Sequence, residues 1–163
     1  MAALDRIGWP PSVGITGRFA SDSAPYGALL LRLSLGALFL AHAGLKLFVF
    51  TPGGTAQFFS SLGLPPTLAY LTIAAEVLSG VALILGLWTR VVALAATPIL
   101  LGAIFTVHGA AGFFFDNAHG GWEYPAFWII ALIVQALLGD GIYALRTSRV
   151  DGSIGGLRDA YSH

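Results

Sequence analysis

The 163-residue sequence contains no cysteine and few charged residues. The absence of cysteine excludes disulfides, thiolate zinc sites, cysteine-ligated iron–sulfur clusters and covalent c-type haem, because each needs a sulfur atom. Any redox role must therefore depend on a bound cofactor or on a partner protein. Charged residues make up 10% of the chain, against about a quarter in typical soluble domains. This scarcity argues against a soluble monomer.

The sequence also lacks an excess of charge of either sign and lacks nucleotide-binding motifs. Eight basic and eight acidic residues give a formal net charge of zero, whereas proteins that bind nucleic acid need clustered positive charge. No GxGxxG or GxxxxGK[ST] pattern occurs, so the sequence gives no sign of a phosphate-binding loop. Nucleic acid and nucleotides are therefore not expected as partners.

Long apolar runs dominate what is present. Hydrophobic residues make up 56% of the chain, and the mean hydropathy is +0.81. A bilayer core needs about 20 apolar residues in a helix, and four stretches satisfy that length: 26–48, 66–88, 90–110 and 124–145. The sequence predicts an all-α fold, an integral membrane four-helix bundle in the lipid bilayer.

The distribution of arginine predicts the orientation of this bundle, because cytoplasmic segments retain positive charge. The basic residues in the two tails and in the corner where the third stretch begins are Arg6, Arg18, Arg90, Arg146, Arg149 and Arg158. With four spans they all fall on one side, so both termini are expected in the cytoplasm. Residues 1–25 and 146–163 would be cytoplasmic tails flanking a membrane domain over 26–145.

Ionisable residues inside the spans are candidate functional groups, because charge is costly in hydrocarbon and usually marks a site. Arg32, Glu76 and Asp140 are predicted to form an inner polar network. At about 1.5 Å per residue, Asp140 matches the depth of Arg32, and Glu76 lies between Arg32 and His42. The alternative is an ion network that only fixes helix packing.

Two helical stripes are expected to face each other, because small residues let helix backbones approach closely in lipid. The stripes are Arg32, Gly36, Phe39, Ala43 and Lys46 in the first span, and Glu76, Gly80, Leu83 and Leu87 in the second.

A second group of polar residues gathers at the opposite, external end. Its members are His42, Lys46, His108, His119, Trp122 and Glu123. A quinone or small aromatic pocket would use them, because such sites need apolar walls and a few hydrogen-bonding groups. Three alternatives stay open: a metal site at His42, His108, His119 and Glu123, a b-type haem between His42 and His108, or groups that only anchor the loop. Metal-ligand spacings such as HExxH are absent, so no metal ligands and no catalytic residue are assigned.

The ordered motifs resemble the DoxX-like family of small bacterial membrane proteins. The matching residues are Arg32, Gly36, Phe39, Gly44 and Lys46, then Glu76, Gly80 and Gly86, then His108, and finally the run Gly120-Gly121-Trp122-Glu123-Tyr124. The resemblance covers about residues 26–145. It implies a four-helix protein of the bacterial inner membrane, linked in some relatives to thiosulfate:quinone oxidoreduction, oxidative-stress defence or resistance to quinones and catechols.

The sequence therefore predicts a subunit of a membrane oxidoreductase system that binds a quinone or related small molecule, with no covalent cofactor. Whether the chain is itself an enzyme stays open. Protein partners of a redox complex are expected, and a homo-oligomer is a further alternative. Two other functions remain: a non-enzymatic scaffold for redox proteins, and a small proton-coupled exporter of aromatic compounds.

Overall fold

A computed structural model of the chain describes residues 15–118 and 120–146, with side chains from Ser23 onward. The predicted tail segments 1–14 and 147–163 lie outside the described residues, as does His119. The elements in chain order are α1 (Ile15–Gly44), the π-helical η1 (Leu45–Val49), α2 (Thr51–Ser61), α3 (Thr67–Leu85), α4 (Thr89–Ala103), the π-helical η2 (Ile104–His108), the short 3₁₀ turn η3 (Gly109–Ala111) and α5 (Glu123–Leu138).

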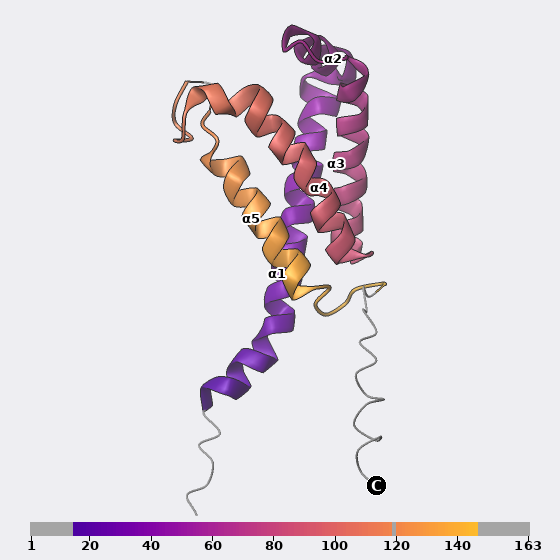
Figure 1. Cartoon of the computed structure of the whole chain (residues 1–163). Helices are drawn as coiled ribbons and strands as arrows, with labels where there is room; N and C mark the ends of the chain where they lie inside the picture. Colours follow the sequence, from indigo (N-terminus) through magenta and orange to yellow (C-terminus); the bar gives the residue numbers. More distant parts are fainter. Residues whose placement is uncertain (1–14, 119, 147–163) are drawn as a thin grey trace, which may run out of the picture.

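The helices pack as two pairs, α1 with α3 and α4 with α5 (Figure 1). Gly36 and Gly80 form the closest approach of the first pair. A Cβ atom added to Gly80 would lie 2.9 Å from the carbonyl oxygen of Gly36, and one added to Gly36 would lie 2.9 Å from that of Gly80. The prediction that the two glycine-bearing stripes face each other is confirmed.

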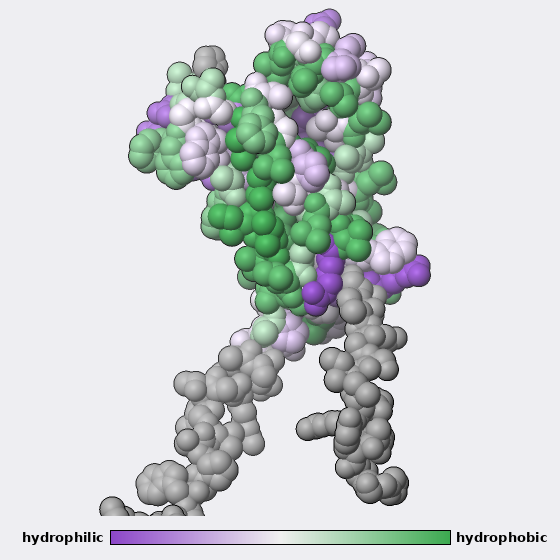
Figure 2. All heavy atoms as spheres, viewed as in Figure 1, coloured by the Kyte–Doolittle hydropathy of each residue, from purple (hydrophilic) through white to green (hydrophobic). Residues whose placement is uncertain are grey.

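The two pairs meet along a core of interdigitated apolar side chains. Phe39, Leu83, Leu132 and Trp128 are buried there, and the Phe39 and Trp128 rings lie 4.8 Å apart. The outward faces are apolar as well, as the green surface in Figure 2 shows. Burying such faces in lipid removes them from water.

Three helical stretches are long and apolar enough to cross a membrane: Ser23–Val49, Thr67–Leu85 and Thr89–Ala111. The fourth, α5, is a shorter apolar helix of 16 residues, which spans about 24 Å. Within the described residues no strand occurs. The chain is an all-α membrane bundle.

The connection between the first two spans differs from the expected loop, because it contains the helix α2. The helix begins immediately after η1 at Thr51, whose φ of 61° is rare for a β-branched residue. The Thr51 hydroxyl accepts a hydrogen bond from Gly54 N, and Thr55 Oγ1 donates to Thr51 O. These bonds stabilise the first turn of α2, which lies across one end of the α1/α3 pair (Figure 1). We call this end of the bundle the α2 end.

Two predicted span boundaries need correction. The fourth span ends at Leu138 rather than at residue 145, because Gly139 adopts a φ of 88° and stops the helix. Asp140 therefore lies in a loop beyond α5 and not within the span. The first helix, in turn, begins at Ile15, so part of the predicted tail 1–25 is helical.

Helix α4 diverges from α3 along its length, although a short turn joins them at Trp88 (Figure 1). Pro98 lies inside α4. Proline removes one backbone donor and clashes with the carbonyl four residues earlier, which bends a helix. Toward the α2 end, α4 lies apart from α3 (Figure 1).

Candidate functional site

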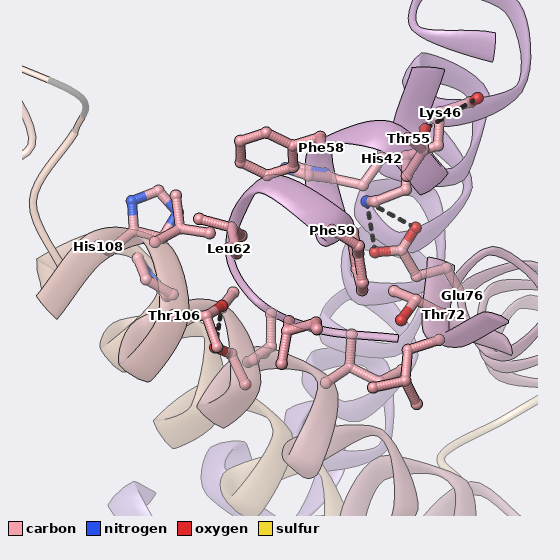
Figure 3. Close-up of a pocket in the computed structure, with 18 of the residues that line it drawn as sticks. His42, Lys46, Thr55, Phe58, Phe59, Leu62, Thr72, Glu76, Thr106 and His108 are labelled. Carbon is pink, nitrogen blue, oxygen red and sulfur yellow. Dashed lines mark hydrogen bonds and ion pairs between the residues drawn. The ribbon is translucent and has the colours of Figure 1, made fainter. Parts of the chain in front are cut away.

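A cavity of about 790 Å³ occupies the space between the two helix pairs at the α2 end. Figure 3 shows its two walls, with Lys46 and Glu76 on one side and His108 and Thr106 on the other. Phe58 and Phe59 of α2 and Leu62, which follows α2, lie between them. The polar residues that line the cavity are His42, Lys46, Thr55, Thr72, Glu76, Thr106, His108 and Tyr124, and the remaining lining is apolar or glycine.

An ion pair between Lys46 and Glu76 joins the two helices of the first wall. Lys46 Nζ donates to both carboxylate oxygens of Glu76, at 2.8 and 2.9 Å. The Glu76 side chain is 6% exposed and that of Lys46 is 19% exposed. An ammonium group has three donors and a carboxylate has about four acceptor positions. The pair therefore satisfies the charge of each residue and keeps hydrogen-bonding capacity that faces the cavity.

Two histidines at the cavity are fixed in the same way. A His42 Nδ1–H donates to Leu38 O at 3.0 Å, and a His108 Nδ1–H donates to Gly120 O at 2.8 Å. A carbonyl oxygen can only accept, so each neutral ring carries its proton on Nδ1 and keeps Nε2 as an acceptor. Both imidazoles can then accept a hydrogen bond, or a proton, from a hydroxyl group.

Aromatic rings form a continuous part of the cavity wall beside His42. The His42 ring stacks on Tyr124 at 6.5 Å with an interplanar angle of 21° and lies 5.0 Å from the Trp128 ring. Tyr124 and Trp128 are 5.8 Å apart. The buried Trp128 Nε1 has no hydrogen-bond partner among the described residues. The wall thus offers flat aromatic surface.

Both π-helical segments carry an ionisable cavity residue. Lys46 lies in η1 and His108 lies in η2. A π-helical turn inserts extra backbone into a helix and is frequent at functional sites. Here the two segments lie at the same end of the bundle and place their charged or titratable side chains on opposite walls (Figure 3).

The structure brings together only part of the predicted pocket. His42, Lys46 and His108 line the cavity, and His119 lies outside the described residues. Trp122 instead packs on Phe113, with ring centroids 4.8 Å apart. Glu123 accepts a hydrogen bond from Phe115 N at 2.9 Å. Neither Trp122 nor Glu123 lines the cavity. Both stabilise the connection between η3 and α5.

The predicted inner network is divided between two places. Glu76 pairs with Lys46 at the cavity, whereas the buried Arg32 lies at the opposite end. Its guanidinium donates to three carbonyl oxygens of the loop after α5, those of Asp140 at 2.8 Å, Ile142 at 3.4 Å and Tyr143 at 3.4 Å. We call this arrangement the Arg32 clasp. Arg32 and Asp140 therefore lie at the same end of the bundle, and this hydrogen bond involves the backbone carbonyl of Asp140.

The Arg32 clasp also holds the corner between α3 and α4. A Cβ atom on Gly86 would collide with Arg32 Nη1, and Gly86 has a φ of 69°. Arg146 N donates to Gly86 O at 3.2 Å. Arg90 Nη1 in turn donates to Ala136 O at 2.9 Å, at the end of α5. Arginine on terminal carbonyls satisfies groups that a helix end leaves open. These contacts are structural and remote from the cavity.

In the described part of the chain, no three histidine, aspartate or glutamate side chains lie close enough together to hold a metal ion. The cavity residues that the sequence did not single out include the polar Thr55, Thr72 and Thr106 and the aromatic Phe58, Phe59, Tyr124 and Trp128. Tyr124 and Trp128 lie four residues apart in an aromatic stretch, which places both on one face of a helix. That spacing was the available signal for the aromatic wall.

Comparison with known proteins agrees with this architecture. The DoxX family model matches residues 27–109. The chain is 40% identical over 125 residues to a protein of Bacillus subtilis (strain 168) named "Putative oxidoreductase CatD", and the match covers 77% of this chain and 88% of that protein. No solved structure gives a significant match. The matched segment contains Arg32, Lys46, Glu76 and His108. The chain belongs to the DoxX family.

Proposed function

We propose that the chain is a subunit of a bacterial inner-membrane oxidoreductase system, and that its cavity binds a quinone or related small aromatic molecule. Its family and its oxidoreductase relative support a role associated with a membrane oxidoreductase. The observation that carries the ligand class is the pairing of an aromatic wall with hydrogen-bonding groups of both kinds inside one apolar cavity.

Each part of the cavity suits one feature of such a ligand. Tyr124 and Trp128 provide surface on which a flat ring can stack. Lys46 Nζ is a donor for a carbonyl oxygen. The Nε2 atoms of His42 and His108 are acceptors for a hydroxyl group. The same cavity can therefore hold an oxidised ring through its carbonyls and a reduced ring through its hydroxyls.

Proton exchange is the chemistry that the chain's own residues would contribute. A bound quinone takes up two electrons and two protons when it becomes a hydroquinone. Imidazole is the side chain whose unperturbed proton affinity suits exchange near neutral pH, and His42 and His108 would exchange protons at Nε2. The electrons would come from a redox partner protein, in redox metabolism or in quinone detoxification.

We also propose that the α2 end faces the outside and that the Arg32 clasp faces the cytoplasm. The clasp end carries Arg90 and Arg146, and the Arg146 guanidinium lies 4.6 Å from the centre of the exposed Trp88 ring. Basic residues favour the cytoplasmic side, and tryptophan favours the interface.

Fluorescence titration of the purified protein with ubiquinone-1 tests the ligand class. We expect saturable quenching that disappears in Trp128→Phe and persists in Trp122→Phe, the matched control on the loop. The double variant Lys46→Met/Glu76→Leu should weaken binding by at least about tenfold, because it removes charge-assisted hydrogen bonds. Equal quenching in wild type and Trp128→Phe, or unchanged affinity in the double variant, would overturn the proposal.

A further inference from the structure

The cavity has its mouth on the side of the bundle, between α3 and α4. The lining residues that are also exposed mark this mouth. They are Phe50, Phe58, Leu68, Pro98, Gly102, Thr106 and Tyr124, and those on α3 and α4, namely Leu68, Pro98 and Gly102, place the mouth between these two helices. Leu68 belongs to the candidate span Thr67–Leu85, and Pro98 and Gly102 belong to the candidate span Thr89–Ala111. The mouth therefore lies at membrane depth, where it faces lipid chains.

Figure 2 shows the same feature from outside. A hydrophilic, purple area lies recessed between two green apolar faces in the upper half of the molecule. The polar part of the cavity is thus reached across an apolar rim. Phe58 and Phe59 of α2, and Leu62 just after it, line the cavity at the α2 end.

The cavity volume exceeds what a single aromatic ring fills. At roughly 30 Å³ for each water molecule, a cavity of about 790 Å³ corresponds to the liquid volume of about 25 waters, several times that of one ring. Its charged groups, Lys46 and Glu76, lie on the α1/α3 wall, whereas the mouth has no charged residue. The space between the polar wall and the mouth suits an apolar chain.

From this geometry we propose that the ligand is an amphiphile of the bilayer, with an aromatic head and a long apolar tail. The head lies near Lys46 and Glu76, and the tail leaves the cavity between α3 and α4, past Thr72, Gly102 and Thr106, into the lipid. The inference rests on the proposed function, since it describes the ligand and the entry route of the same cavity. It makes the residues of the mouth determinants of specificity.

Gly102 offers a way to obstruct the mouth without disturbing the fold. A Cβ atom added there meets no other atom within 4 Å, and Gly102 lines the cavity. A leucine at this position has room to extend into the mouth. Gly27 is the matched control, because it is also a helical glycine with no atom within 4 Å of an added Cβ. It lies far from the cavity near the start of the first span.

The experiment measures binding of two ligands with one ring chemistry, decylubiquinone and the tail-free ubiquinone-0, to protein in lipid nanodiscs. We expect wild type to bind decylubiquinone more tightly. Gly102→Leu should weaken decylubiquinone binding by at least about tenfold, because it displaces a few buried methylene groups, and should change ubiquinone-0 binding less than threefold (about 0.6 kcal/mol). Gly27→Leu should leave both affinities unchanged.

The possible results separate this inference from the proposed function. Binding of both quinones to wild type with no effect of Gly102→Leu would overturn the mouth as the path of the tail and leave the ring site intact. An equal loss of affinity for both quinones in Gly102→Leu would also overturn the assignment of the tail. The leucine would then interfere with binding of the ring, which both quinones share. Failure of both quinones to bind wild type would overturn the proposed function and this inference together.

Discussion

Lys46 and Glu76 come from different helices, yet the ammonium group of Lys46 lies 2.8 and 2.9 Å from the two carboxylate oxygens of Glu76. This pair connects the π-helical end of α1 to the middle of α3 at the cavity wall. A buried charge is stable only when its partner is present. The pair is therefore both a structural link and the polar part of the candidate site.

Removing one member of the pair should destabilise the protein more than removing both. Lys46→Met leaves the Glu76 carboxylate buried without its cation, and we expect it to lower the free energy of unfolding by about 3 kcal/mol. The double variant Lys46→Met/Glu76→Leu should recover most of this loss. Denaturant unfolding in detergent, arranged as a double-mutant cycle, measures the difference. A double variant as unstable as the sum of the two single variants would contradict the coupling.

Because α1 packs closely on α3, we expect larger side chains at their contact to destabilise the protein. Gly80→Ala places a Cβ atom 2.7 Å from Leu40 Cγ and 2.9 Å from Gly36 O, so we expect a loss of roughly 1–3 kcal/mol in unfolding free energy. Gly27→Ala adds the same atom in open space and should be neutral or slightly stabilising. Thermal unfolding of both variants in one detergent makes the comparison. Equal stability of the two proteins would show that the helices do not meet at these glycines.

The Arg32 clasp should control the order of the loop after α5 independently of the cavity. Arg32→Gln removes charge-assisted hydrogen bonds to the carbonyls of Asp140, Ile142 and Tyr143. We expect amide hydrogen exchange in residues 139–146 to become about tenfold faster or more. Glu76→Gln is the matched control, and it should leave exchange in this loop unchanged. Equal acceleration by both variants would indicate one polar network instead of two separate sites.

Membrane orientation can be tested cleanly because the chain has no cysteine. Ser61→Cys places a thiol at the exposed end of α2, and Tyr143→Cys places one at an 82% exposed position in the clasp loop. We expect a membrane-impermeant maleimide to label only Ser61→Cys in intact spheroplasts and to label both variants after lysis. The reverse pattern would invert the proposed orientation.

The sequence was a good guide to the hydrophobic spans and a poorer guide to their ends. Gly36 and Gly80 could be paired because helical spacing fixes which residues share a face. The end of α5 at Gly139 was missed, since the apolar pattern continues through Ile142 and Leu145 while the backbone turns away. Helix α2 was missed because its sequence, TPGGTAQFFSS, contains two glycines and a proline, all poor helix formers.

The site was only partly predictable for similar reasons. The sequence placed Lys46 at the external end and Glu76 between Arg32 and His42, but that estimate compares backbone depths and ignores the reach of a lysine side chain. The π-helical segments η1 and η2 give no signal in the hydrophobic pattern, although they carry Lys46 and His108. His42, Lys46 and His108 could be selected as residues able to hydrogen-bond a ligand. Trp122 and Glu123 were selected on the same ground, but they stabilise the loop.

The most direct test of the account is an experimental density map of the protein in nanodiscs with decylubiquinone. The account predicts ring density between the Lys46–Glu76 pair and the Tyr124–Trp128 wall, with tail density passing Gly102 between α3 and α4. Ring density elsewhere, or a cavity that holds only a lipid chain at saturating decylubiquinone, would contradict the central claim that this cavity is the ligand site.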